Sequence, residues 1–145
     1  MAEASFEIRD YDPVTDFEAV QGVLDNAGLF DADYDNADRL ARWIAIQPDA
    51  IVVATVDEEV VGSVYFQDGI IPLIFRLAVH EAHRENGIGT ALLHEAEQRA
   101  RRVGHAFVEL FVRAADAPEA ERWYRHRGYN VSGVYANMVK EFSQD

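Results

Sequence analysis

Two glycines in the segment 83–92, which reads HRENGIGTAL, have a spacing that suggests chemistry. Gly87 and Gly89 lie one residue apart, Arg84 precedes Gly87 by three residues, and a helical pattern begins directly afterwards. Because small residues let backbone N–H groups converge on an anion at a helix N-terminus, the segment predicts an anion site, most often for phosphate. A plain strand-to-helix turn that uses glycine for positive φ is the alternative that these glycines alone leave open.

Two common phosphate loops fit this segment poorly. The Walker A loop ends in Gly-Lys-Ser/Thr, and the segment contains no lysine. The dinucleotide-binding fingerprint requires a third glycine three residues after Gly89, where Leu92 stands, and it follows the first strand of a parallel sheet. Neither a nucleoside triphosphate nor a dinucleotide is therefore the favoured ligand.

A third template fits better, because the segment resembles the pyrophosphate loop of the GNAT acyltransferase superfamily, Arg/Gln-x-x-Gly-x-Gly/Ala. Upstream, the run Leu77-Ala78-Val79-His80 looks like the end of the strand that feeds this loop. Downstream, the family's Ala-x-x-Leu-Tyr-x-x-x-Gly-Phe segment is similar to Ala120, Trp123-Tyr124 and Gly128-Tyr129. Two matches at the family's spacing identify the chain as resembling a GNAT N-acetyltransferase over almost its whole length.

The resemblance implies acetyl-CoA, or a related acyl-CoA, as co-substrate. The residues whose backbone would receive the pyrophosphate are Arg84, Glu85, Asn86, Gly87, Ile88, Gly89 and Thr90. The pantetheine arm would run beside Leu77, Ala78 and Val79 and pair with backbone like an added strand. Ala117 stands where family members often carry a cofactor-contacting Asn, with Asp116 beside it, so the residue that makes this contact stays open.

Two side chains are candidates for proton transfer. The resemblance makes Tyr124 a cofactor contact and the general acid for the departing CoA sulfur; a core aromatic on the helix face that it shares with Ala120 is the alternative. Glu109 is the candidate base, because it is an acid within the apolar run 106–112, although an exposed or ion-paired carboxylate has the same pattern. A base is useful because a lysine-type amine, with a pKa near ~10.4, is neutral in only about one molecule in 2,500 at pH 7. The carboxylates between Asp31 and Asp38 are a second source of a base.

The elements that must position these residues follow from apolar periodicity and turn residues. Expected strands are 6–9, 50–56, 60–66, 70–79, 106–112, 129–131 and 134–142. Expected helices begin at Asp12-Pro13, carry Leu40 to Ile44, and span 90–103 and 118–126. The pattern predicts one GNAT-type α/β domain over 1–145, with a mixed, mostly antiparallel sheet of six to seven strands and about four helices on both faces.

Composition narrows the range of partners. Asp and Glu number 26 against 13 Lys and Arg, the net charge is -13, and Lys140 is the only lysine, so a nucleic acid is not expected as partner. Such acidic chains resemble those of halophilic organisms; a GC-rich genome that encodes Arg for Lys is the alternative. The chain has no cysteine and no apolar run of transmembrane length, so we expect a cytoplasmic protein without membrane partners. His80 and His83 lack a third ligand nearby, so no metal site is expected.

The predicted function is transfer of an acetyl group from acetyl-CoA to a primary amine by direct attack within a ternary complex. The acceptor would be a small molecule, an amino acid or a protein N-terminus, and a homodimer is compatible with the sequence. The alternatives are an acyl-CoA-binding module that senses without turnover and a nucleotide-binding regulator.

Overall fold

The structure is a computed structural model that describes residues 5–113 and 116–143. The chain divides into two compact units, one up to Leu110 and one from Phe111 onward. The first unit contains the sheet and most helices, and the second contains one helix and the C-terminal segment.

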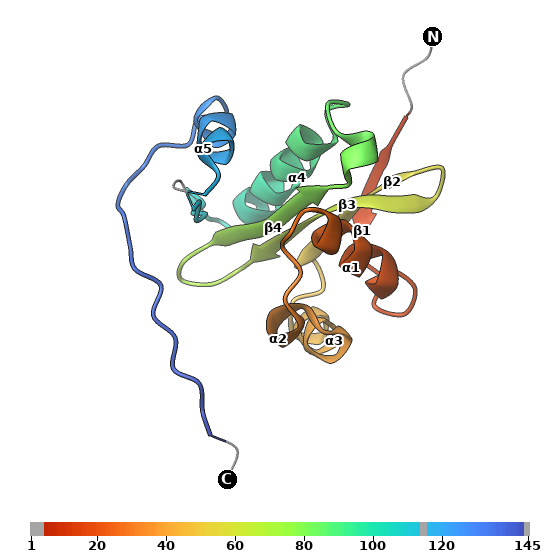
Figure 1. The fold of residues 1–145 in the computed structure, drawn as a ribbon, viewed down its shortest axis with the longest axis horizontal. Coiled ribbons are helices and arrows are strands. Elements are labelled where there is room, and N and C mark those ends of the chain that lie inside the picture. The colour runs from red at the N-terminus through yellow and green to blue at the C-terminus, as the bar shows by residue number, and fades with distance from the viewer. Residues whose placement is uncertain (1–4, 114–115, 144–145) are drawn as a thin grey trace. The chain divides into compact units, whose positions relative to one another are not determined.

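The first unit is built on a four-stranded antiparallel sheet in the order β1-β2-β3-β4 (Figure 1). Its strands are β1 (Glu7–Asp10), β2 (Ile51–Val56), β3 (Glu59–Gln67) and β4 (Leu73–Val79). Asp57 and Glu58 connect β2 to β3 with φ values of 50° and 69°, which is the left-handed geometry of a tight hairpin turn. The predicted meander is therefore confirmed.

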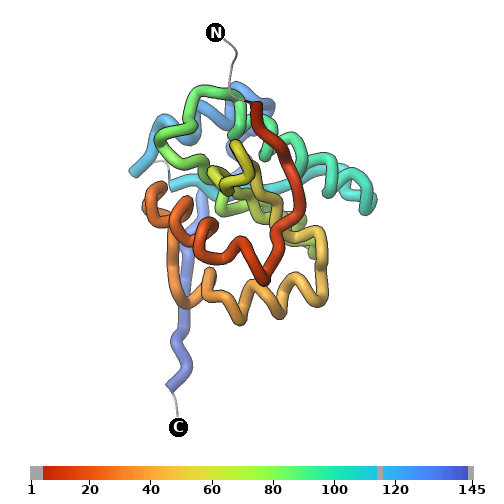
Figure 2. The backbone as a smooth tube through the Cα atoms, turned by 90° about the vertical axis from the view of Figure 1, so that its right-hand side faces the viewer, coloured from red at the N-terminus to blue at the C-terminus, as the bar shows by residue number. Residues whose placement is uncertain are grey.

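Helices cover both faces of this sheet, as Figures 1 and 2 show. On one face lie α1 (Phe17–Asn26), α2 (Ala32–Asp35) and α3 (Ala37–Ile46), and on the other lies α4 (Ile88–Arg102). Every residue of β2 is buried, as a strand between two helical layers must be. The main apolar cluster on the α1 side includes Val20, Val23, Leu24, Leu40, Ile51, Val53 and Tyr65.

Helix α4 is bound to the sheet by the apolar stripe that the sequence predicts. Leu92, Leu93, Ala96 and Ala100 are buried, whereas the predicted fifth member, Val103, follows the last helical residue and is 49% exposed. Gly62 of β3 permits the close approach of this helix: a Cβ there would lie 3.0 Å from Leu92 Cδ1 and 3.1 Å from the Ala78 carbonyl oxygen.

Helix α1 begins later than the Asp12-Pro13 signal predicts. The Asp12 carbonyl accepts bonds from the N–H groups of Thr15 and Asp16, which makes a separate turn, and α1 starts only at Phe17. Val14, expected on the apolar stripe, is 89% exposed because it lies in this turn. The Asp16 carboxylate accepts the Asp12 N–H at 2.8 Å and so stabilises the turn.

The strand count is lower than predicted and the helix count is higher. The described residues form four strands instead of six to seven, and five α-helices, because Asp31 caps an additional short helix, α2. The expected strand 106–112 contributes only one parallel bridge, between Leu73 and Glu109. Residues 129–131 and 134–142 are not strands in the described part of the chain, where Val134 and Met138 are about nine-tenths exposed. Alternating apolar residues make a strand only when a partner strand accepts their backbone hydrogen bonds.

Candidate active site

Strand β4 contains a bulge that changes which way its side chains point. Tyr65 pairs with Phe75 and Ser63 pairs with Ala78, so two residues of β4, Arg76 and Leu77, stand opposite one residue of β3. Phe75 and Ala78 both pack on the α1-side cluster, although residues three apart in a regular strand face opposite sides. The bulge absorbs this difference, and Arg76 has a φ of 53°, a left-handed conformation that is rare for a residue with a side chain.

The segment after β4 forms a compact turn that leads into α4. A short 3₁₀ turn, η1 (Glu81–His83), follows the strand, and the Glu81 N–H donates to Asn26 Oδ1 of α1 at 2.9 Å. Arg84 Nε donates to the Val79 carbonyl at 2.9 Å, so this side chain folds back over the strand end. His80 Nδ1 accepts the Ala82 N–H at 3.2 Å, which makes His80 a local cap.

The glycine segment forms the N-terminus of α4, as predicted. Gly87 is the N-cap with a φ of 83°, and a Cβ at this position would meet nothing within 4 Å, so the backbone conformation alone requires glycine. Glu85 also has a positive φ, 69°, and its side chain is exposed. Ile88 is buried and anchors the first turn. The first-turn amides have no preceding helical carbonyl, and they carry the positive end of the helix dipole.

The outer edge of β4 has strand pairing at its beginning only. Ile74 N–H donates to the Glu109 carbonyl at 2.9 Å, and Glu109 N–H donates to the Pro72 carbonyl at 2.8 Å. No further bridge continues along β4 within the described residues. His80 N–H donates to Val61 of β3, so the backbone groups of Val79 point to the outer side, where its carbonyl meets Arg84. The Val79 carbonyl is already bonded to Arg84, so the strand end that leads into the glycine turn presents the Val79 N–H to an added partner.

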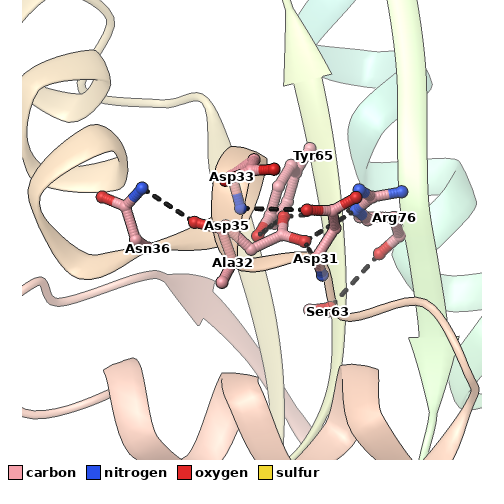
Figure 3. A network of polar contacts seen from close by, with 8 residues as sticks. All are labelled: Asp31, Ala32, Asp33, Asp35, Asn36, Ser63, Tyr65 and Arg76. Carbon is pink, nitrogen blue, oxygen red and sulfur yellow. Dashed lines mark hydrogen bonds and ion pairs between the residues drawn. The ribbon is translucent and has the colours of Figure 1, made fainter. Parts of the chain in front are cut away.

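A buried carboxylate, Asp35, lies beside the bulge on the α1 side of the sheet (Figure 3). Its side chain is 1% exposed and meets Arg76, whose Nε donates to both carboxylate oxygens at 3.2 Å. The Tyr65 hydroxyl donates to Asp35 Oδ1 at 3.0 Å, and the Asp31 N–H donates to Asp35 Oδ2 at 2.9 Å. Burial and the Asp35 carboxylate raise the pKa of Tyr65, so this hydroxyl keeps its proton and stays a donor.

This network changes the interpretation of the acids between Asp31 and Asp38. The Asp35 carboxylate accepts hydrogen bonds at both oxygens, so it is engaged in the fold. Asp31 caps α2, and its side chain accepts the Asp33 N–H at 2.9 Å. Arg76, an arginine inside an apolar strand, thus has an acid as its partner.

Glu109 lies near the start of β4, far along the strand from the glycine turn. Its parallel bridge to Leu73 places it four residues before Leu77, which is about 13 Å at ~3.3 Å per residue. Glu109 is partly buried, and its backbone bonds tie it to the strand. The Glu109 side chain is therefore too short to contact a group bound beside Val79. To act there as a base, it would need a bridging water.

Tyr124 and Ala117 belong to the second unit, on α5 (Pro118–Arg125). Ala117 is the N-cap of this helix, and Pro118 at the first turn confirms the predicted start. Tyr124 makes edge-to-face contacts with Trp123, at 5.0 Å between ring centroids, and with Tyr129, at 5.6 Å. Burial raises the pKa of Tyr124, against a smaller opposite effect of the Arg127 charge. Its hydroxyl is therefore protonated throughout the neutral range.

Comparison with known proteins identifies the family. A family model described as an acetyltransferase (GNAT) domain matches residues 31–131, well over half of the chain. The chain belongs to the GNAT acetyltransferase family. It is an acyltransferase enzyme, and the match spans both the glycine turn and α5. No curated protein is significantly similar to it.

Solved structures support this GNAT fold. Ard1 from Thermoplasma volcanium is 27% identical, with a TM-score of 0.75 over 88% of this chain and 84% of that chain. The PaiA N-acetyltransferase from Thermoplasma acidophilum, in complex with coenzyme A, is 19% identical, with a TM-score of 0.70 over 84% and 88%. A GNAT-family protein from Desulfovibrio desulfuricans is 20% identical, with a TM-score of 0.75 over 89% and 87%. The last two share too little sequence to indicate more than the fold.

The structure of this GNAT enzyme thus brings Leu77–Val79 and the glycine turn together in its first unit. The structure also places Asp35 and Tyr65 beside β4, which the sequence does not single out. The sequence signal for this network is Arg76, an arginine inside an apolar strand. None of the helices in the described ranges is long and apolar enough to cross a membrane.

Proposed function

We propose that this GNAT enzyme transfers the acetyl group of acetyl-CoA to a primary amine by direct attack within a ternary complex. One observation carries the proposal: the open end of β4 leads, through the short turn η1, to a left-handed glycine at the N-terminus of α4. An acyl-CoA needs both features side by side: a strand edge for its extended arm, and the positive end of a helix dipole for its pyrophosphate. The coenzyme A complex of the similar PaiA fold supports the same choice of co-substrate.

The pyrophosphate would be held mainly by backbone. The proposed contacts are the N–H groups of residues 84–90, with Gly87 setting the direction of the helix entry. This arrangement suits a chain of net charge -13, because the binding groups are dipoles and do not depend on lysine. The exposed carboxylate of Glu85 is compatible with it, because the proposed contacts come from backbone.

The thioester arm would lie along Leu77, Ala78 and Val79. An extended arm pairing with this strand end would place the thioester carbonyl beside backbone N–H donors just after the bulge. Such donors stabilise the oxyanion that forms when the amine attacks, commonly by ~3 kcal/mol for each donor. The attack makes the new amide bond and breaks the bond from the acyl carbon to sulfur, and CoA leaves as its thiolate, which takes up a proton from solvent.

Tyr124 is the proposed donor to the leaving sulfur. A tyrosine with pKa ~10 is a weaker acid than a thiol with pKa ~8.5, so full proton transfer is uphill by about 2 kcal/mol before any shift. The raised pKa of Tyr124 increases that difference. Its role is therefore to hydrogen-bond the thiolate, with the amine proton leaving to solvent or to a base such as Glu109.

We further propose that both units act as one catalytic domain, since the family match continues across the boundary between Leu110 and Phe111. The acceptor is a small amine, an amino acid or a protein N-terminus. The lack of cysteine suits a reducing compartment, and we propose the cytoplasm.

The proposal is tested by incubating the enzyme with acetyl-CoA and each of a panel of amines, and by measuring the free thiol that is released. The chain contains no cysteine, so every thiol detected comes from CoA. Turnover with at least one primary amine is expected. If CoA raises the midpoint of thermal unfolding but no amine is acetylated, the non-catalytic acyl-CoA-binding module is favoured. If acyl-CoA neither raises that midpoint nor supports turnover, the proposal is refuted.

Two glycine variants separate binding from stability. Gly87→Ala forces a side chain into a φ of 83° and should raise the KM for acetyl-CoA about tenfold. Gly28→Ala is the matched control, because Gly28 also has positive φ, 72°, and open space, but it ends α1. The control should lower thermal stability to a similar extent and leave KM unchanged. Equal KM values in both variants would contradict the pyrophosphate assignment.

Two further variants test the roles of Tyr124 and Glu109 in the reaction. Tyr124→Phe should lower kcat at least tenfold with acetyl-CoA affinity unchanged. Glu109→Gln should lower kcat by no more than about threefold, because its distance from Val79 allows action only through water. An unchanged kcat in Tyr124→Phe would remove Tyr124 from the mechanism.

The acidic surface adds a salt test, and we propose that the enzyme is adapted to high salt. Long-range repulsion between CoA and the surface is screened at molar salt, where the Debye length is ~3 Å, while short N–H contacts persist. Affinity for acetyl-CoA should hold or improve as salt rises. A steep loss of affinity would mean that basic side chains hold the phosphates.

A further inference from the structure

We propose, resting on the proposed function, that Asp35 is a positioning residue: through Arg76 it holds the bulge of β4 that aims Leu77–Val79 at the acyl-CoA arm. The pair joins α2, on one face of the sheet, to the strand that carries the thioester. Figure 3 shows the Arg76 side chain reaching from β4 to the carboxylate of Asp35.

The bulge needs support because its first residue is strained. Arg76 has a φ of 53°, in a region where the Cβ of an L-residue crowds its own backbone. Glycine would adopt this conformation without that crowding, yet the chain places an arginine there. Such strain persists only where the surroundings over-determine the conformation.

Contacts at both ends of Arg76 provide that support. At the backbone, Ser63 Oγ donates to the Arg76 carbonyl at 3.2 Å, and Ser63 is fully buried in β3. At the side chain, Nε donates to both oxygens of Asp35, and the guanidinium carbon lies 5.9 Å from the Tyr34 ring centroid. The residue is therefore held from two elements, and it cannot turn to a regular strand conformation without breaking a buried ion pair.

Asp35 is itself fixed by its neighbours. The Tyr65 hydroxyl and the Asp31 N–H occupy its oxygens from β3 and from the N-cap of α2, respectively. Tyr65 is further fixed by edge contacts with Trp43 and Phe75, at 5.6 and 5.2 Å between ring centroids. A carboxylate held this firmly can impose a backbone geometry on the strand beside it.

The geometry of the strand end depends on this bulge. Removing it would shift the side chains of Leu77–Val79 to the opposite face, because register in a strand has a period of two. It would also reverse the backbone groups that Val79 turns outward. Since a misplacement of about 1 Å can lower a rate by about a hundredfold, a lost bulge should act on kcat.

Two substitutions at one position test the proposal. Arg76→Ala and Arg76→Gly both remove the ion pair, but only glycine adopts positive φ without strain. Arg76→Ala should lower kcat about thirtyfold or more, whereas Arg76→Gly should retain at least tenfold more activity than Arg76→Ala. Equal losses in both variants would mean that the side chain acts by contacting the acceptor, and wild-type rates in both would mean that the bulge needs no support. Either result overturns the proposal.

Asp35→Asn tests the other partner, with Asp16→Asn as the matched control. Asp16 is also a buried aspartate paired with an arginine, but it lies next to β1, at the opposite edge of the sheet. Asp35→Asn should lower kcat about tenfold with a KM for acetyl-CoA within about threefold of wild type, and Asp16→Asn should change neither. A similar kcat in both variants would contradict the positioning role. If Asp35→Asn does not fold, the two Arg76 variants decide the question alone.

A measurement that does not depend on turnover distinguishes failure of the proposed function from failure of the positioning role of Asp35. Backbone amide NMR shifts of Leu77, Ala78 and Val79 should move in Arg76→Ala and return toward wild type in Arg76→Gly. If the wild-type enzyme acetylates no amine but this pattern is observed, the proposed function fails and the support of the bulge stands. If turnover is observed and the shifts are equal in both variants, the positioning proposal fails alone.

Discussion

Two buried aspartates of this chain pair with arginine, and the two pairs are built differently. Asp16 accepts hydrogen bonds from Nη1 and Nη2 of Arg9 at 2.6 and 2.9 Å, in a bidentate arrangement, and the Arg9 side chain is 41% exposed. Asp35 meets only Nε of Arg76, at 3.2 Å to each oxygen, and Arg76 is 20% exposed. The first pair joins residues seven apart and closes a turn, whereas the second joins residues 41 apart and fixes a strained backbone. An aspartate–arginine pair thus stabilises local structure in one region and sets the geometry of a strand in the other.

Outside the Asp35–Arg76 pair, the largest expected effect on stability is at the local pair of Arg9 and Asp16. Asp16→Asn should lower the free energy of unfolding by about 2 kcal/mol, which is below the range for a fully buried pair because Arg9 is partly exposed. The Asp12 N–H also loses a charged acceptor. Urea unfolding measures the change. A loss as small as that of an exposed ion pair would show that the turn before α1 holds without its carboxylate.

The next effect concerns the hydroxyl that supports Asp35. Tyr65→Phe should lower the free energy of unfolding by about 1.5 kcal/mol, the usual contribution of a hydrogen bond to a charged group. It should also lower kcat severalfold, less than Asp35→Asn, because Arg76 and Asp31 still bind the carboxylate. Urea unfolding together with kcat measurement checks both parts. Loss of stability with an unchanged kcat would mean that Tyr65 contributes to the stability of the fold and not to catalysis.

A smaller effect is the acid sensitivity of the Arg9–Asp16 pair. Burial raises the pKa of Asp16, but bonds from Arg9 and the Asp12 N–H outweigh it and leave the pKa below its usual value. A lowered folded pKa gives stability that is present above the unfolded pKa of ~3.9 and lost as the pH falls through the folded value. Stability should therefore decrease below about pH 4 in the wild type and less steeply in Asp16→Asn. Equal slopes in urea unfolding across pH 2 to 5 would contradict this sign.

The smallest effect at neutral pH is expected for Tyr11, close to the first pair. Its ring is buried, and its hydroxyl has no hydrogen-bond partner within the described residues. Tyr11→Phe should therefore leave stability within about 0.5 kcal/mol of wild type or raise it. A loss above that value would reveal a partner for the hydroxyl.

The same residue makes a prediction at alkaline pH. Burial, together with the nearby charges of Asp16 and Asp12, raises the pKa of Tyr11 to about 12. A raised pKa gives stability that is present below the unfolded value of ~10 and lost as the pH rises from about 10 toward 12. Thermal unfolding between pH 9 and 12 should show a shallower decline in Tyr11→Phe than in wild type. An identical decline would place the alkaline sensitivity elsewhere, with Tyr65 as the next candidate.

Much of the first unit could be predicted because its signals are local. The three meander strands, the apolar stripe of α4 and the glycine turn each depend on residues close together in the chain. The start of α1 was wrong because Asp12-Pro13 is a helix signal that Asp16 overrides by closing a turn. Glu109 was assigned from an apolar strand pattern, and only one bridge of that strand forms.

The candidate site was predictable only in part, for the same reason. Gly87 and Leu77–Val79 carry a motif that can be recognised in a short segment. Asp35 could not be selected among its acidic neighbours, because burial by Tyr65 and Arg76 is what distinguishes it from Asp31, Asp33 and Asp38.

The amino-acid sequence is enough to predict the acidic surface, the order of the meander, the glycine turn at the start of α4 and the resemblance to acetyltransferases. The folded chain is needed to see that Arg76 is left-handed, that Asp35 is its partner, and that the alternating C-terminal residues lack a strand partner in the described chain. Turns and helix ends are set by neighbouring residues and their backbone preferences. An ion pair across 41 residues, or a strand, exists only when another segment supplies the matching groups, and the folded chain alone specifies which segment that is.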